Sequence, residues 1–364
     1  MSEIHAQRRA RLAEALAQTD ADAALITRLV NVRYLTGLAS SNAALLVRRD
    51  GDATLATDGR YTTAAKEAAP DIELVSERAV AEALARLGSE SGPTRLAVEE
   101  HDVTLALAAA IEKAAAQAEL VHLGRVVERL RTVKDDDELA NLREACAISC
   151  RALEDLYAAG RFIGRTEREI ARDLEARMVE HGADGLAFET IVATGPNSAI
   201  PHHRPTHRTV ERGDLLKIDF GALYRGYHAD CTRTSVVGAE PADWQREIYD
   251  LVADAQRAGR EALAPGAECI AVDNASRDII KAAGHGEHFG HGTGHGVGME
   301  IHEAPTLGYS ATGTLSARTP VTVEPGVYLP GRGGVRIEDT LVVRDGDGAE
   351  LLTSTTKEML VLNA

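Results

Sequence analysis

Helical spacing and short apolar runs alternate from the N-terminus to about His122. Helical stretches are expected near Arg8–Ala17, Arg60–Ala69, Ala79–Leu87 and Val103–Ala116. Strand-like runs are Ala23–Thr27, Ile72–Val75, Leu96–Val98, and the pair ALLVRR and ATLAT on either side of Asp50-Gly51. Asp-Gly between two apolar runs is a hairpin signature. The pattern predicts a small α/β domain, whose limits we place at residues 1–130.

The rest of the chain, residues 131–364, shows the same order of elements twice. Two helical stretches, near residues 136–158 and 166–181, precede a β-rich stretch at 188–237. Two more, near 242–263 and 269–283, precede another at 289–362. The residues themselves show no clear repeat, so the repeat is one of architecture. We therefore predict an α+β domain of two α-α-β-β halves, with a site between them.

Composition narrows the class of protein. The 364 residues are 44% hydrophobic and 26% charged, as in globular proteins, and the length favours two domains. The amphipathic N-terminus lacks the apolar core of a secretory signal, and no apolar run is long enough to span a bilayer. A cytoplasmic protein is expected. A net charge of −16 argues against nucleic-acid binding. The four cysteines form no C-x-x-C pair and are expected to be buried and inert.

Candidate chemistry is expected in the second half, because ten of the thirteen histidines lie between His181 and His302. The run DLLKIDFGALYRGYHADCTRTSVV predicts a hairpin. A loop centred between Tyr224 and Arg225 would make Asp219 and Asp230 cross-strand neighbours, with Cβ atoms about 4.5–5.5 Å apart. Two carboxylates at that separation indicate a shared proton or a cation between them. The alternative is that one of them lies in a bulge and points to solvent.

A glycine-rich segment, HGEHFGHGTGHGVGMEIHEAP, concentrates five histidines, namely His285, His288, His291, His295 and His302. Glycine lets a backbone turn sharply and approach a ligand closely, and imidazole is a common metal ligand and proton carrier. The spacing differs from H-E-x-x-H, which argues against a helical zinc site. A generic His-rich metal-storage tract is the alternative.

Two glutamates follow in strand-like surroundings. Glu324 ends the run VTVE before Pro325-Gly326, and Glu338 lies in VRIEDTLVV, where burial is costly without a partner. Taken alone, Glu338 could pair with Arg336, which has the same strand parity. Together, four carboxylates and one or more histidines provide the oxygen-rich, partly nitrogen ligand shell that suits two divalent ions, with Mn²⁺, Co²⁺ or Zn²⁺ as candidates.

These motifs resemble the pita-bread metallopeptidases, which include Xaa-Pro aminopeptidase, prolidase and methionine aminopeptidase. The resemblance rests on SAIPHHRPTHRTVERGDLLKIDFGALYRGYHADCTRT, HGTGHGVGMEIHEAP, TVEPGVY and GVRIEDT, in that order. NVRYLTGLASSNAALLV and ATDGRY in the first third also resemble the creatinase-like N-terminal domain of the aminopeptidase P and prolidase branch. Methionine aminopeptidases generally lack that domain.

The resemblance implies a ligand set and roles for its neighbours. Asp219 would hold one ion, His295 and Glu324 the other, and Asp230 and Glu338 would bridge them with a water or hydroxide. Glu324 or Glu338 would shuttle a proton. Three histidines would hydrogen-bond the substrate or intermediate, and Arg336 would orient a carboxylate or bind substrate; the histidines are His202, His291 and His302. His203 would point elsewhere in an extended strand.

The implied activity is hydrolysis of the Xaa-Pro bond, either at the N-terminus of peptides or in dipeptides, with Mn²⁺ as the first choice of metal. That bond is a tertiary amide without an N–H, so a dedicated pocket makes sense. A methionine aminopeptidase is the enzymatic alternative, and a non-catalytic peptide- or histone-binding module is the alternative of a different class. Proline-containing peptides are the expected partners, together with a second copy in a homodimer.

Overall fold

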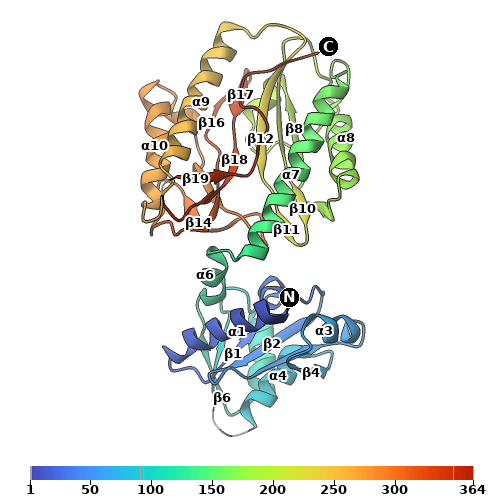
Figure 1. Ribbon diagram of the computed structural model, residues 1–364, viewed down its shortest axis with the longest axis vertical. Helices are drawn as coiled ribbons and strands as arrows, with labels where there is room; N and C mark the ends of the chain where they lie inside the picture. Colours follow the sequence, from blue (N-terminus) through green and yellow to red (C-terminus); the bar gives the residue numbers. More distant parts are fainter. Residues whose placement is uncertain (1, 91, 93, 347, 364) are drawn as a thin grey trace. The chain divides into compact units, whose positions relative to one another are not determined.

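The structure is a computed structural model that describes residues 2–90, 92, 94–346 and 348–363 (Figure 1). The chain divides into two compact units, Met1–Arg131 and Thr132–Ala364. None of the helices in the described ranges has both the length and the apolar character needed to span a bilayer. The four cysteines are free and buried, as the sequence predicts.

The first unit is built on a mixed six-stranded sheet of order β4-β3-β2-β1-β5-β6. Its strands are β1 (Ala23–Ile26), β2 (Ala43–Arg48), β3 (Ala53–Thr57), β4 (Glu73–Ser76), β5 (Thr94–Val98) and β6 (Ala118–His122). Its helices are α1 (Ser2–Ala17), α2 (Leu29–Thr36), α3 (Thr62–Ala68), α4 (Val80–Ser89) and α5 (Leu105–Ala114), and α6 (Val126–Thr132) reaches the boundary. The predicted hairpin at Asp50-Gly51 is confirmed by the antiparallel β2–β3 pair.

Residues at the helix termini explain where two helices of this unit begin or end. The hydroxyl of Thr104 accepts a hydrogen bond from the amide of Leu107, which caps the start of α5. Helix α2, which the hydrophobic pattern did not predict, ends at Gly37 with a φ of 80°. The core lies between the sheet and the helices and contains buried Leu25, Leu46 and Leu84.

The second unit repeats one order of elements, as predicted. The first half has α7 (Asp136–Ala159), α8 (Glu167–Glu180), β7 (Gly185–Leu186), β8 (Ile191–Thr194), η1 (Gly195–Ala199), β9 (Leu215–Phe220), β10 (Ala222–Tyr224), β11 (Tyr227–His228) and β12 (Cys231–Val237). The second has α9 (Asp243–Glu261), α10 (Cys269–Ala282), η2 (Gly286–His288), β13 (Gly294–Gly296), β14 (Glu303–Leu307), β15 (Pro320–Val323), β16 (Gly326–Leu329), β17 (Gly333–Arg336), β18 (Asp339–Val343), β19 (Ala349–Leu351) and β20 (Val361–Leu362).

Each half of this unit packs two helices against its own strands. Figure 1 shows α7 and α8 on one side of the strands and α9 and α10 on the other. The main sheets have the orders β20-β12-β9-β8 and β14-β13-β15-β18-β19. The first of the four predicted helices, α7, begins at a reciprocal capping box that Asp135 and Glu138 form at its N-terminus. The strand ends of both halves supply the residues described next.

Candidate active site

The hairpin that carries Asp219 has a different register from the one predicted. Its two-residue turn is Arg225-Gly226, with φ values of 49° and 84°, so the turn is centred one residue later. Asp219 therefore pairs with Thr232 and not with Asp230. The prediction of direct cross-strand neighbours was wrong by two positions, because the turn type was not recognised from the sequence.

The two aspartates nevertheless lie on the same face, because a register error of two positions preserves strand parity. Asp230 is diagonal to Asp219, in the irregular segment just before β12. Gly221 lies opposite this segment, and a Cβ atom there would come within 1.8 Å of the Ala229 carbonyl oxygen. Glycine therefore permits the close approach that bends the hairpin at Asp230.

The glycine-rich segment brings His295 to the same place. His295 lies in β13 between Gly294 and Gly296, where a Cβ atom would clash with the carbonyls of Thr322 and Ala304, respectively. Its Nδ1 donates to the Gly296 carbonyl over 3.0 Å. This bond leaves Nε2 as the ligand atom, as is usual for metal-binding histidines.

The glutamates complete the cluster. Glu324 directly follows β15, and its Oε1 lies 3.3 Å from Nε2 of His295. Glu338 directly precedes β18, so the expectation that Asp230 and Glu338 lie within strands was wrong. Asp230, His295 and Glu338 each offer an atom within 4.8 Å of the others, which is a separation that one cation can span.

Electrostatics show that this cluster suits positive ions. Burial, followed by neighbouring carboxylates, raises the pKa of both Asp230 and Glu338 well above their ordinary values. Burial would also raise the pKa of Glu324, but its contact with His295 lowers it to about 2. Among the described residues, Oδ1 of Asp219 is buried and has no hydrogen-bond partner. An unpartnered carboxylate oxygen beside the buried carboxyl groups of Asp230 and Glu338 and the half-buried carboxylate of Glu324 is the donor set that divalent cations require.

Arg336 holds the other oxygen of Asp219. Its Nη2 donates to Oδ2 of that aspartate, so the Arg336–Glu338 pair considered above does not form and Arg336 orients a different carboxylate. The remaining guanidinium donors reach the hydroxyls of Thr232 and Tyr328 and the carbonyl of Pro201 over 2.9–3.2 Å. With its nitrogens engaged in this way, Arg336 fixes the site's geometry.

The histidines expected to contact substrate line a cavity of about 690 Å³, and the carboxylates of the cluster line the same cavity. His202 and His302 are exposed in it, and the ring of His302 lies edge-on to that of His295 with centroids 4.4 Å apart. His291 is bonded through Nδ1 to the Gly292 carbonyl and through Nε2 to the Tyr328 hydroxyl. His203 also lines the cavity, but its side chain is buried and hydrogen-bonded to Glu167. We expected His202 and His203 to lie in an extended strand, whereas they lie in a turn and the loop that follows it.

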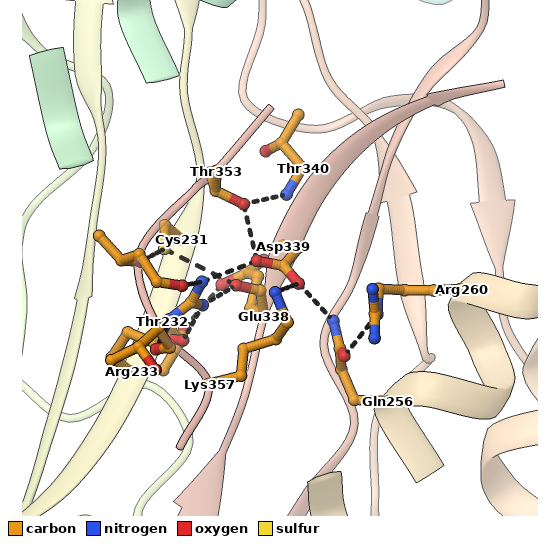
Figure 2. Close-up of polar contacts among 12 residues, drawn as sticks. Cys231, Thr232, Arg233, Gln256, Arg260, Glu338, Asp339, Thr340, Thr353 and Lys357 are labelled. Atoms are coloured by element: carbon orange, nitrogen blue, oxygen red, sulfur yellow. Dashed lines mark hydrogen bonds and ion pairs between the residues drawn. The ribbon is translucent and has the colours of Figure 1, made fainter. Parts of the chain in front are cut away.

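A buried ionic network backs the ligands (Figure 2). Arg233 on β12 donates to the main-chain carbonyl of Glu338 and, over 2.8 Å, to Oδ1 of Asp339. Asp339 also accepts from Gln256 over 2.8 Å and lies 3.1 Å from Nζ of Lys357. The network ties the chain beside Glu338 to α9 and to the C-terminal segment.

Sequence reasoning missed several residues that hold this site. Thr232 donates its hydroxyl hydrogen to Oε2 of Glu338 over 2.6 Å, and Thr340 donates to the carbonyl of Asp230 over 2.8 Å. Threonine and arginine in strands are ordinary, so nothing in DCTRT or EDT alone marked Thr232, Arg233 or Thr340. Each lies two or three residues along the chain after Asp230 or Glu338, and this spacing was the available signal.

Comparisons with known proteins show the family of the chain. The family model for metallopeptidase family M24 matches residues 140–345, and that for the creatinase/prolidase N-terminal domain matches residues 8–133. An Xaa-Pro dipeptidase of Pyrococcus horikoshii is 34% identical over 359 residues, 96% of this chain and 97% of that protein.

Two solved structures are similar over nearly the whole chain. An Xaa-Pro dipeptidase from Bacillus anthracis has a TM-score of 0.94 at 37% identity and covers 98% of this chain and 100% of its own. An X-Pro aminopeptidase from Thermotoga maritima has a TM-score of 0.89 at 35% identity and covers 97% and 99%. These likenesses confirm the predicted creatinase-like N-terminal domain and pita-bread fold. The chain belongs to metallopeptidase family M24.

Proposed function

We propose that this protein is a metal-dependent exopeptidase that hydrolyses the Xaa-Pro bond of dipeptides or at the N-terminus of peptides. The observation that carries the proposal is the gathering of Asp230, His295 and Glu338 within 4.8 Å at a large cavity. The whole-length similarity to proteins called Xaa-Pro dipeptidase and X-Pro aminopeptidase supports the choice of substrate. A complete set of carboxylates and histidine argues against a non-catalytic binding module.

Five residues would hold two divalent ions. Asp219 would hold one through its free Oδ1, and His295 and Glu324 would hold the other, with Asp230 and Glu338 between them. When bound, such ions supply a water of lowered pKa and a Lewis acid for the scissile carbonyl. Mn²⁺ is our first choice of metal, with Co²⁺ or Zn²⁺ as alternatives, because the ligand set is mostly oxygen with one nitrogen.

The chain's other residues would bind and orient the peptide. His202 and His302 present exposed rings to the cavity, where each could donate to a substrate carbonyl or to the developing oxyanion. His291 would act through Tyr328, whose hydroxyl it shares with Arg336. A carboxylate oxygen of Glu324 or Glu338 would carry the proton to the proline nitrogen.

The test compares turnover of an Xaa-Pro dipeptide, an Xaa-Pro-Xaa peptide and a matched Xaa-Ala peptide. We expect cleavage of the proline substrates in the presence of Mn²⁺ and its loss on chelation. A metal-loaded sample that cleaves neither proline substrate would overturn the proposal. The ratio of the two proline rates separates the dipeptidase from the second candidate, an aminopeptidase, which the similarity to the Thermotoga maritima enzyme favours.

We further propose that the protein is a homodimer, as its resemblance to the aminopeptidase P and prolidase branch implies. Sedimentation velocity at micromolar concentration measures the mass directly. A single species near the 38.8 kDa of one chain would contradict this proposal.

A further inference from the structure

Glu167 is a fully buried carboxylate that has no role in the proposed reaction. It is the first residue of α8, and its side chain is 0% exposed. Burial alone would raise the pKa of this carboxyl, but hydrogen bonds from Thr206, Asn197, His203 and Thr194 lower it to about 2. A buried anion that stays charged carries a large desolvation cost, so its partners are the place to look for its purpose.

All of these partners belong to one segment, residues 194–206. Oε1 accepts from the amide and hydroxyl of Thr194 over 2.9 and 3.1 Å and from Asn197 over 2.9 Å. Oε2 accepts from the ring of His203 over 2.8 Å and from the amide and hydroxyl of Thr206 over 2.8 and 2.6 Å. One carboxylate is thus hydrogen-bonded to the first and the last residue of the segment, Thr194 and Thr206.

The middle of the segment is held by two basic side chains, Lys217 and Arg336. Lys217, two residues before Asp219 on β9, donates from Nζ to the carbonyls of Ser198 and Ile200 over 3.0 and 2.7 Å. Arg336 donates to the next carbonyl, that of Pro201, over 3.2 Å. The same guanidinium holds Asp219, so the segment is connected to the carboxylate cluster.

His202 lies between the two sets of contacts. The carbonyls of the two residues just before it accept hydrogen bonds from Lys217 and Arg336, and the ring of the residue just after it is bonded to Glu167. Within the described part of the chain, the side chain of His202 has no hydrogen bond of its own, and it is exposed in the cavity. Its place is therefore set by the backbone on either side and not by its own contacts.

From this arrangement we propose that Glu167 is a positioning residue for His202, acting through the segment 194–206. The inference rests on the proposed function, in which His202 contacts the substrate. Because a preorganised donor is more effective than a mobile one, loosening the segment would weaken substrate or transition-state binding and leave the metal ligands in place.

Glu167→Gln is a sharp test because glutamine cannot replace this carboxylate. Each oxygen accepts a main-chain amide, from Thr194 or Thr206. A threonine hydroxyl or a histidine ring can become an acceptor, but a backbone N–H cannot. In either orientation the glutamine NH₂ therefore faces a main-chain N–H. Glu169→Gln is the matched control, since Glu169 lies on the same helix and, within the described part of the chain, its carboxylate hydrogen-bonds only Thr166 at the helix start.

The activity test is a double-mutant cycle on Xaa-Pro cleavage with wild type, Glu167→Gln, His202→Ala, the double variant and Glu169→Gln. We expect Glu167→Gln to lower kcat/KM by about tenfold or more, the equivalent of one lost charged hydrogen bond. The double variant should be no slower than His202→Ala, and Glu169→Gln should match wild type. Multiplicative losses in the double variant would overturn the proposal, since Glu167 would then act independently of His202.

Hydrogen exchange separates this proposal from the proposed function. Glu167→Gln should raise the exchange rate of the Thr206 amide by about tenfold, whether or not the protein cleaves any peptide. Mn²⁺ affinity, measured by calorimetry, should stay within a factor of about two of wild type. Unchanged exchange in residues 195–206 would overturn the proposal. If Glu167→Gln does not fold, Thr206→Val removes one hydroxyl donor and keeps the amide, and the same outcomes apply.

Discussion

The hydroxyl of Thr232 on β12 and the carboxylate of Glu338, just before β18, are joined by a hydrogen bond of 2.6 Å. The same hydroxyl accepts from Nε of Arg336 over 3.1 Å. The amide of Glu338 in turn donates to the carbonyl of Thr232 over 3.1 Å. A single threonine therefore fixes both the backbone and the side chain of one proposed bridging ligand.

The main-chain bond from the Glu338 amide to the Thr232 carbonyl survives any side-chain change at position 232, so the hydroxyl can be tested alone. We expect Thr232→Val to weaken metal binding by about 10–100-fold, as loss of a partner behind a metal ligand generally does. Thr232→Ser keeps the hydroxyl and should stay close to wild type. Calorimetric titration with Mn²⁺ measures both affinities.

Thr234→Val is the matched control for this change. Thr234 lies two residues further along β12, is equally buried, and donates to the main-chain carbonyl of Arg336 over 2.9 Å. The Thr234→Val variant should lose about as much stability as Thr232→Val, about 1–3 kcal/mol, but its metal affinity should not change. Equal affinity losses at positions 232 and 234 would mean that the effect is general loosening of the strand.

Asp230→Asn tests the proposed bridging role directly. An amide provides one weaker, neutral donor in place of a carboxylate, so we expect the variant to lose measurable binding of one ion and turnover of every Xaa-Pro substrate. Metal content after dialysis and the rate of dipeptide cleavage are the two measurements. Full turnover with two ions per chain would refute the assignment of Asp230.

The two aspartates of the candidate site could be predicted from the sequence, because a register error of two positions leaves a side chain on the same face of a strand. The turn at Arg225-Gly226 moved the register by two positions, yet Asp219 and Asp230 stayed on one face, because side chains in a strand alternate with a period of two. The choice of His295 among five histidines came from family resemblance alone. No pattern in the glycine-rich segment could have selected it, because the regular elements there, η2 and β13, are too short to show a period.

Glu167 shows what the sequence could not provide. An acidic residue in the first turn of a helix is already explained by the helix dipole, so Glu167 looked ordinary. Its partners lie 27 to 39 residues away, in a segment without regular spacing. Only the three-dimensional structure shows that this carboxylate is buried and that its partners surround His202.

The pKa of His291 gives a prediction for pH. Burial, aided by the nearby Arg336 cation, lowers the pKa of His291 below its ordinary value, with Glu324 opposing the shift. A lowered pKa means that the folded state binds the proton less tightly than the unfolded chain. The resulting stability is present above the unfolded value of about 6.5 and is lost as the pH falls through the folded value.

Wild type should therefore lose more stability than His291→Gln between pH 7 and pH 5. The expected difference is about 1.4 kcal/mol for each unit by which the pKa is lowered. Urea denaturation of both proteins at the two pH values, with a chelator present throughout, measures it. Equal losses in the two proteins would show that His291 has no part in the acid response.

Two substitutions in the ionic network around Asp339 should differ in how much they lower the stability of the fold. Asp339 is fully buried and faces Arg233 at 2.8 Å and Lys357 at 3.1 Å. Asp339→Asn would leave the buried Arg233 guanidinium without its anion, at a cost of about 3–5 kcal/mol. Lys357→Met removes a cation that is 23% exposed, and should cost about 1 kcal/mol or less. Urea denaturation ranks the two.

The same pair of variants tells whether the network also supports the metal site. Arg233 donates to the main-chain carbonyl of Glu338 as well as to Asp339, so an arginine without its anion would reorient and move that ligand. Asp339→Asn should therefore weaken Mn²⁺ binding, whereas Lys357→Met, which leaves Arg233 paired, should not. If Asp339→Asn folds and binds Mn²⁺ with wild-type affinity, the network stabilises the fold only. The position of Glu338 would then depend on its contacts with Thr232 and not on the anion that pairs with Arg233.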